Sequence, residues 1–144
     1  MLVDANLLLY SVDETSHFHE PAATWLQRTL NGPRRVGLPW QALTAFVRVV
    51  THPRAVAKPR SPDEAWEKVQ AWLSLDVTWV PTPTDRHAEI LGSLVRSYQV
   101  RGNLVYDAHL AALAIEHGLT LCSADTDFGR FEELTWENPL ARRR

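Results

Sequence analysis

The amino-acid sequence predicts an α/β fold, in which helices flank a mostly parallel sheet of short strands. Short apolar runs alternate along the chain with longer segments of helical periodicity. This alternation is typical of parallel strands joined by right-handed crossover helices. The chain has 144 residues and contains no repeat, low-complexity tract or linker, so we expect one domain at 1–144. The arginine-rich segment 141–144 is expected to be a disordered basic tail.

Prolines and apolar runs define the expected elements in the first half of the chain. Pro21 fits the first turn of one helix, and Pro39 can open the next, which should stop near Pro53. The expected elements are a strand at 1–3, helices at 5–10 and 22–30, a strand at 35–38 and a helix at 40–51.

Capping signals define the second half. Ser61 and Glu64 form a capping box around Pro62, and Gly118 stands where a left-handed helix C-cap is expected. The expected elements are a helix after Ser61, a strand at 77–80, a helix capped by Thr84, a helix at 104–117, a strand at 119–122 and an edge strand at 134–136. In the helix after Ser61, the side chains expected to face the core are those of Ala65, Trp66, Val69, Trp72 and Leu73.

Four aspartates lie near the predicted carboxyl edge of the sheet. Asp4 ends the first strand, and Asp125 and Asp127 follow the strand at 119–122. Asp107 lies in the first turn of the preceding helix, where a carboxylate is favoured. Ligands of open α/β sheets bind beyond the carboxyl ends of the strands, so Asp4, Asp107 and Asp125 converge if the two strands are neighbours. Carboxylates this close repel one another unless a cation neutralises them, and Mg²⁺ or Mn²⁺ prefers oxygen ligands.

Each aspartate also has a local explanation that requires no metal. Asp4 could cap the first helix, and Asp107 could simply complement the helix dipole. Asp125 and Asp127 could be turn residues, with Asp127 capping the short segment 128–131. The metal hypothesis therefore depends on these residues meeting at one edge of the sheet.

Composition argues against several other classes of protein. The single cysteine, Cys122, excludes an intramolecular disulfide and is expected to be an inert buried thiol. The six histidines form no zinc motif, and there is no glycine-rich nucleotide-binding loop. No apolar run reaches the length of a membrane span and the N-terminus does not resemble a secretory signal, so a cytoplasmic location is expected.

Charge and aromatic residues leave nucleic-acid binding open. The net charge of −2 argues against binding driven by overall charge, but not against a local basic face. One segment without acidic residues contains Arg48, His52, Arg54, Lys58 and Arg60, and its alternative interpretation is a solvated loop. Trp40 and Phe46 could stack an RNA base, although core packing is the favoured interpretation. Core or interface positions are expected for Trp25, Trp66 and Trp72.

Three segments resemble those of PIN-domain ribonucleases, specifically the VapC-type toxins of toxin–antitoxin pairs. They are the opening LVDANLLLY, the middle LPWQALTAFVRVVTHPR, and the late NLVYDAHLAALAIEHGLTLCSADTDFGRF, which is followed by WENPL. The resemblance covers essentially the whole chain, and the late segment is its most specific part. It implies a PIN-like three-layer sandwich with a short-stranded sheet of about five strands.

The resemblance also implies an activity and partners. The activity is metal-dependent hydrolysis of RNA phosphodiester bonds. Its cofactor would be Mg²⁺, with Mn²⁺ as the alternative, held by Asp4, Asp107 and Asp125 as catalytic residues and by Asp127 as a further ligand. VapC-like proteins usually form homodimers and are inhibited by an antitoxin whose tail covers the active site. A VapB-like antitoxin and a second copy of the chain are therefore the expected protein partners.

The helix after the second strand departs from the family pattern. Many PIN nucleases carry a glutamate there, whereas Thr44 or Ala45 occupies that place in this chain. The missing charge favours a single well-held ion and leaves a slower enzyme open. Thr44 could hold a water and Arg48 could reach a substrate phosphate. Asn6 and Ser123 could bind water or phosphate, or could make only local turn hydrogen bonds.

Two other functions remain compatible with the sequence. A catalytically weak or inactive PIN-like module would bind RNA or a protein partner without cleaving, and the missing glutamate supports it. A phospho-acceptor receiver domain also holds Mg²⁺ in an acidic pocket of an α/β sheet. Receivers place an adjacent acidic pair after the first strand, whereas Asp4 is followed by Ala5 and Asn6, so this alternative is the weakest.

Overall fold

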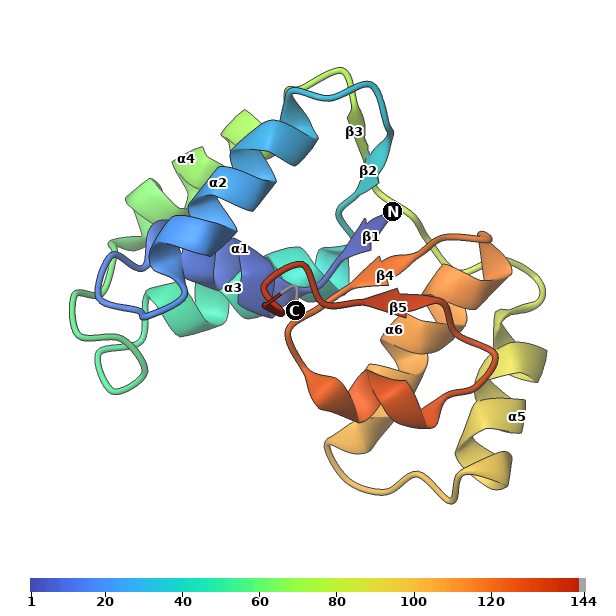
Figure 1. Ribbon diagram of the computed structural model, residues 1–144. Coiled ribbons are helices and arrows are strands. Elements are labelled where there is room, and N and C mark those ends of the chain that lie inside the picture. Colours follow the sequence, from blue (N-terminus) through green and yellow to red (C-terminus); the bar gives the residue numbers. More distant parts are fainter. Residues whose placement is uncertain (143–144) are drawn as a thin grey trace.

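A computed structural model describes residues 1–142 and contains one parallel sheet of five strands (Figure 1). The strand order is β3-β2-β1-β4-β5, and every neighbouring pair is parallel. The strands are β1 (Leu2–Val3), β2 (Val36–Gly37), β3 (Thr78–Trp79), β4 (Leu121–Cys122) and β5 (Trp136–Glu137). This confirms the expected parallel, short-stranded sheet and makes β1 and β4 neighbours.

Six α-helices and one short 3₁₀ helix connect these strands. They are α1 (Ala5–Val12), α2 (His19–Leu30), α3 (Trp40–Val50), α4 (Pro62–Leu73), α5 (His87–Ser97), α6 (Leu104–Glu116) and the 3₁₀ helix η1 (Thr126–Arg130). Figure 1 shows α1 to α4 on one side of the sheet and α5, α6 and η1 on the other. Among residues 1–142, no helix combines the length and apolarity needed to cross a membrane.

Each strand of the central pair contributes side chains to both faces of the sheet. Val3 and Cys122 join the core under α1 to α4, whereas Leu2 and Leu121 join the core under α5, α6 and η1. This alternation is what a period of two residues requires of a strand that is covered on both sides. The two cores and the sheet between them form the three layers that the sequence predicts.

Several local predictions are confirmed. Ser61 and Glu64 form both hydrogen bonds of a capping box at the start of α4. Gly118 has a φ of 65°, so it occupies the left-handed region directly after α6. Cys122 is 2% exposed, and burial raises the pKa of its thiol to about 11, which agrees with an inert core position. Phe46 is 1% exposed and therefore packs in the core.

Three local predictions are wrong. Core packing was the favoured interpretation for Trp40, but this residue begins α3 with its side chain 45% exposed. Trp66 is 45% exposed because the buried face of α4 passes through Ala65, Val69 and Trp72, and Trp66 lies beside that face. Thr84 does not cap α5, which begins three residues later at His87. The Thr84 hydroxyl instead accepts a hydrogen bond from the Arg86 amide at 3.2 Å, so it closes a local turn before the helix.

Element ends also differ from expectation. The helix predicted at 22–30 begins at His19, with Pro21 inside its first turn, and the last strand lies at Trp136–Glu137 at the edge of the sheet. The basic tail predicted at 141–144 includes residues 143 and 144, which lie outside the described residues.

Candidate metal centre

The carboxyl ends of β1 and β4 bring the first two predicted site residues to the same edge of the sheet. Leu2 pairs with Leu121 and Val3 pairs with Cys122, so the two strands end side by side. Asp4 follows β1 directly, and its amide donates a hydrogen bond to the Cys122 carbonyl at 3.0 Å. Asp125 follows β4 after a short turn, and it therefore lies beyond the end of the neighbouring strand.

Helix α6 supplies the third acidic side chain. Because α6 leads directly into β4, its N-terminus and Asp107 lie at the edge where the strands end. One carboxylate oxygen each from Asp107, Asp125 and Asp127 can be chosen so that all lie within 4.8 Å of one another. Asp107 and Asp125 are half-buried, whereas Asp127 is exposed. We call these three residues together with Asp4 the acidic cluster.

Asp4 lies next to Asp107, Asp125 and Asp127 but is not one of the three residues whose oxygens lie within 4.8 Å of one another. Its Oδ1 accepts a hydrogen bond from the Ala5 amide at 2.7 Å, so it does cap α1. Its Oδ2 accepts a hydrogen bond from the Ser123 hydroxyl at 2.7 Å. The same carboxylate raises the pKa of Asp107 by charge repulsion, which places it within electrostatic reach of the cluster. Capping and participation in the site are therefore compatible at this residue.

Ser123 joins the acidic residues on the two strands. It is fully buried, and its hydroxyl oxygen also accepts hydrogen bonds from the Asn6 amide group at 3.1 Å and from the Asp125 backbone amide at 3.0 Å. The Asn6 carbonyl accepts a hydrogen bond from the Ala124 amide at 3.3 Å. Both polar groups of Asn6 are thus used inside the protein, so Asn6 and Ser123 position the aspartates.

The acidic turn differs in one respect from its predicted form. Asp125, not Asp127, caps η1, because its side chain accepts a hydrogen bond from the Asp127 amide at 2.9 Å. Asp127 pairs instead with Arg130, whose Nη2 lies 3.3 Å from Oδ1. Sequence alone identified a capped segment here but assigned the cap to the wrong aspartate.

The acidic cluster is electrostatically unfavourable in the absence of a cation. Burial and, after it, the charges of Asp125, Asp4 and Asp127 together raise the pKa of Asp107 to about 6, against the opposing effect of Arg130. Burial also raises the pKa of Asp4, with hydrogen bonds from Ser123 and Ala5 opposing the shift. Mg²⁺ binds oxygen at about 2.0–2.1 Å, so opposite ligands of one ion are about 4.2 Å apart. The oxygens of Asp107, Asp125 and Asp127, which lie within 4.8 Å of one another, would move closer together to hold one divalent cation.

Helix α3 contributes polar groups but no carboxylate to this edge. Thr44 and Arg48 are exposed, and the Thr44 hydroxyl donates a hydrogen bond to the Trp40 carbonyl at 2.7 Å. The Gln41 side chain donates a hydrogen bond to the Tyr106 carbonyl at 3.0 Å, which ties the start of α3 to the start of α6. The two helices therefore open onto the same edge.

A second group of polar side chains, which sequence reasoning missed, lies between α5 and α6. His87 Nδ1 lies 2.6 Å from Glu116 Oε2, and His87 Nε2 lies 2.9 Å from His109 Nδ1. The second oxygen of Glu116 accepts a hydrogen bond from the Thr84 amide at 2.7 Å. These contacts join α5 to α6 and use both oxygens of Glu116 and both ring nitrogens of His87. As the helical spacing predicts, His109 is directed away from Asp107.

Comparison with known proteins identifies the family of this chain. Residues 1–134 match the PIN domain family. Ribonuclease VapC37 of Mycobacterium tuberculosis is 44% identical over 140 residues, which cover 97% of each chain. Ribonuclease VapC43 of the same species is 37% identical over 140 residues, covering 97% of this chain and 95% of that protein.

Solved structures of low sequence identity share the fold. FitAB bound to an IR36 DNA fragment contains a chain with a TM-score of 0.70 and 17% identity, covering 99% of this chain and 97% of its own. VapC20 of M. tuberculosis, a Sarcin-Ricin loop cleaving toxin, has a TM-score of 0.65 and 19% identity, covering 93% and 98%. The chain therefore belongs to the PIN-domain family and, within it, to the VapC ribonucleases.

Proposed function

We propose that this protein is an endoribonuclease that hydrolyses RNA phosphodiester bonds with a divalent cation and acts as the toxin of a toxin–antitoxin pair. The observation that carries the proposal is the convergence of Asp4, Asp107 and Asp125 at one sheet edge, although they lie in separate parts of the sequence. The VapC ribonucleases that match nearly the whole chain support the same activity.

Mg²⁺ is the proposed cofactor, with Mn²⁺ as the alternative. Asp107, Asp125 and Asp127 would hold the ion, and Asp4 would contribute its charge from the neighbouring strand. A bound divalent cation lowers the pKa of water and stabilises the charge that develops on the phosphate oxygens. Ser123 supports this role because one hydroxyl contacts both Asp4 and the Asp125 amide, and so fixes their separation.

We further propose that the site holds one ion firmly. Helix α3 carries no acidic residue in its range Trp40–Val50, so a second ion would lack the charge that many PIN nucleases provide from this helix. Thr44 would offer the lone pairs of its hydroxyl to a bound water. Arg48 would bind a substrate phosphate, since it is exposed and forms no ion pair within residues 1–142.

The proposed partners follow from the same family. A VapB-like antitoxin would inhibit the enzyme by covering the acidic cluster, and a second copy of the chain would form a homodimer. Known structures with this fold include VapBC2 from Rickettsia felis bound to a DNA fragment from their promoter, with a TM-score of 0.66. The enzyme would act in the cytoplasm, where its RNA substrate is found.

A catalytically weak or inactive PIN-like module is the second candidate function. The absence of an acidic side chain from α3 favours it, because fewer charges weaken the affinity for a cation. Such a module would bind RNA or a protein partner but would not cleave.

Cleavage by matched aspartate variants distinguishes these two functions. The protein purified without its antitoxin should cleave RNA in the presence of Mg²⁺ or Mn²⁺. Asp4→Asn and Asp107→Asn should each lower the rate more than about 100-fold, since even outer partners of a metal ligand contribute 10–100-fold. Asp85→Asn changes an exposed aspartate in the turn before α5, and it should cleave like the wild type. Equal cleavage by all four proteins would indicate a contaminating nuclease and favour the inactive module.

A further inference from the structure

Three aromatic side chains on α3, α4 and α6 are exposed. Trp40 and Trp66 are each 45% exposed, and Tyr106 is 67% exposed. The rings of Trp40 and Trp66 are stacked, with their centroids 6.3 Å apart and their planes 9° from parallel. Apolar side chains that group together on a surface often mark a binding site, whereas scattered ones are common. We call these three residues the aromatic patch.

The aromatic patch adjoins the proposed active site. Tyr106 directly precedes Asp107 in the first turn of α6. The Gln41 side chain, next to Trp40 in α3, donates a hydrogen bond to the Tyr106 carbonyl at 3.0 Å. One hydrogen bond therefore joins the helix start that bears Trp40 to the helix start that bears the acidic residue.

A stripe of exposed residues continues from Trp40 along α3. Trp40, Thr44 and Arg48 are spaced by four residues, so they lie on one face of the helix, and all three are exposed. At 1.5 Å per residue, the stripe extends about 12 Å from the tryptophan to the arginine. It presents first an aromatic ring, then a hydroxyl and then a guanidinium group.

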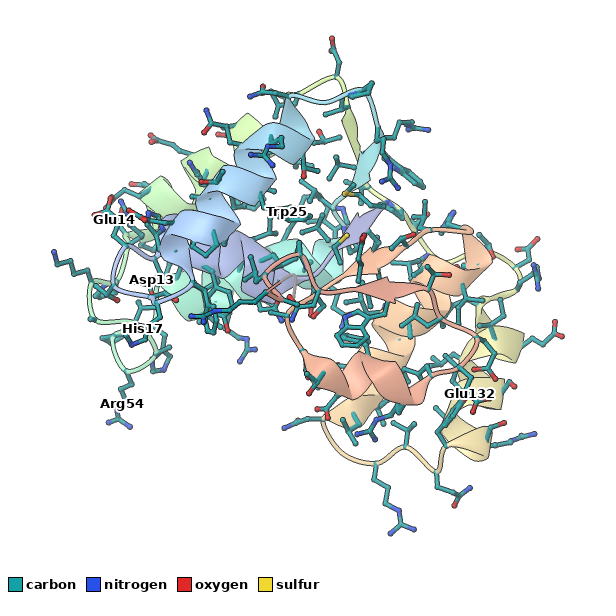
Figure 2. All side chains as sticks on the ribbon, viewed as in Figure 1. Asp13, Glu14, His17, Trp25, Arg54 and Glu132 are labelled. Atoms are coloured by element: carbon teal, nitrogen blue, oxygen red, sulfur yellow. The ribbon has the colours of Figure 1, made fainter. Side chains whose placement is uncertain are left out.

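The far end of the stripe is basic. A surface hollow there is lined by Arg48, Val49, His52, Arg54 and Ala55. Figure 2 shows Arg54 extending from the loop after α3, away from the body of the protein. No acidic residue occurs in the sequence from Trp40 to Arg60, so nothing in this segment neutralises the arginines.

We propose that the exposed face of α3 is a binding track for a single-stranded segment of the RNA substrate, with a base stacked on Trp40 and phosphates bound by Arg48 and Arg54. Single-stranded RNA is held by this pairing of aromatic stacking surfaces and positive charge. The Trp66 ring acts through Trp40, because its stacking orients that side chain for an incoming base. The substrate class rests on the proposed function, whereas the track itself does not depend on cleavage.

Charge favours RNA over a protein as the ligand of this face. The segment from Trp40 to Arg60 contains no acidic residue, so its arginines favour an anionic ligand such as the phosphates of RNA. The track leads from the aromatic patch to Arg48 and Arg54. Phosphates complement the arginines at one end of the track, and bases complement the aromatic rings at the other end.

Binding of RNA to a cleavage-deficient protein tests the inference. The probe is a fluorescently labelled, unstructured single-stranded oligoribonucleotide, and every protein carries Asp107→Asn so that the probe stays intact. Trp40→Ala should weaken binding about tenfold, because a stacked base contributes that order of affinity. Trp40→Phe keeps an aromatic face and should recover most of the loss. Neither change should alter binding of a double-stranded probe, whose bases are already stacked.

The dependence of affinity on salt tests the basic end of the track separately. Each phosphate contact to a single strand contributes about 0.7 to the slope of log affinity against log salt. Arg48→Gln and Arg54→Gln should each reduce the slope by about this amount. Arg28→Gln is the matched control, because this exposed arginine lies in the last turn of α2, which leads to the amino end of β2.

The outcomes separate this inference from the proposed catalytic function. Unchanged affinity in folded Trp40→Ala and unchanged slopes in Arg48→Gln and Arg54→Gln would overturn the track, even if the wild type cleaves RNA. A wild type that binds RNA through Trp40 but does not cleave it would overturn only the catalytic proposal. Loss of dimer or antitoxin binding in Trp40→Ala, with RNA binding intact, would assign the aromatic patch to a protein interface and overturn the track. Circular dichroism verifies that each variant is folded.

Discussion

Helix α6 carries two polar residues that meet opposite environments. Asp107 contributes to the acidic cluster, where the carboxylates of Asp125, Asp4 and Asp127 oppose its ionisation. Two positions later, His109 contacts His87 at 2.9 Å, and His87 in turn contacts Glu116 at 2.6 Å. The first group consists of like charges, whereas the second pairs donors with acceptors. Helix α6 therefore borders one group of carboxylates that repel one another and one group of side chains that are hydrogen-bonded to one another.

The two groups differ in their effect on stability. Between α5 and α6 the Glu116 side chain is fully buried, yet each of its oxygens accepts a hydrogen bond, so the group stabilises the contact of the helices. In the acidic cluster the protein holds partly buried carboxylates that repel one another, and a bound cation would neutralise them. The carboxylates proposed to bind a metal ion should therefore destabilise the metal-free chain, and substitutions in the two regions should act in opposite directions.

The largest expected effect on stability comes from Glu116. Glu116→Ala leaves the Thr84 amide and the His87 ring without their acceptor, so it should lower the free energy of unfolding by about 3 kcal/mol. Glu116→Gln keeps one acceptor oxygen and should lose less. Urea denaturation measures both. A change below about 0.5 kcal/mol in Glu116→Ala would show that the contact between α5 and α6 does not depend on this network.

A smaller effect of opposite sign is expected from Asp107 in metal-free protein. Its pKa is raised to about 6 in the folded state, against about 4 in an unfolded chain, so the folded state ionises less readily. Stability that is present below about pH 4 is therefore lost as the pH rises through 6. Relative to Asp107→Asn, the wild type should become progressively less stable across this window and then remain level.

Urea midpoints measured from pH 4 to 7 in the presence of a chelator test this pH dependence. Asp85→Asn removes one carboxylate from an exposed position and controls for the change in net charge. A constant difference between wild type and Asp107→Asn across the window would mean that neither burial nor the neighbouring carboxylates raise the pKa of Asp107 in the folded protein.

The acidic cluster could be predicted from the sequence because the order and direction of the strands determine which residues meet. Asp4 and Asp125 each follow a strand, and parallel neighbouring strands end at one edge, so their approach needs no knowledge of side-chain packing. Asp107 follows the same rule through the helix that leads into β4. Apolar periodicity likewise identified the helices and the parallel sheet, although the strands are only two residues long.

The missed features depend on contacts between distant segments or on competing local bonds. His87 and Glu116 are 29 residues apart, and nothing in either segment indicates that they meet. Periodicity assigned Trp66 to the core, but it could not show that Ala65 occupies the central position of the buried face. Thr84 and Asp127 stand in patterns typical of caps, but the Thr84 hydroxyl accepts from the Arg86 amide before the helix, and the Asp127 carboxylate pairs with Arg130.

Direct titration of the metal-free protein with Mn²⁺, followed by electron paramagnetic resonance, is the most decisive measurement. We expect the wild type to bind one ion per chain firmly, and Asp107→Asn to bind it more than about 100-fold more weakly, since even outer partners of a ligand contribute 10–100-fold. Asp85→Asn should bind like the wild type. Equal Mn²⁺ affinity in the wild type and Asp107→Asn would contradict the assignment of the acidic cluster as the metal centre.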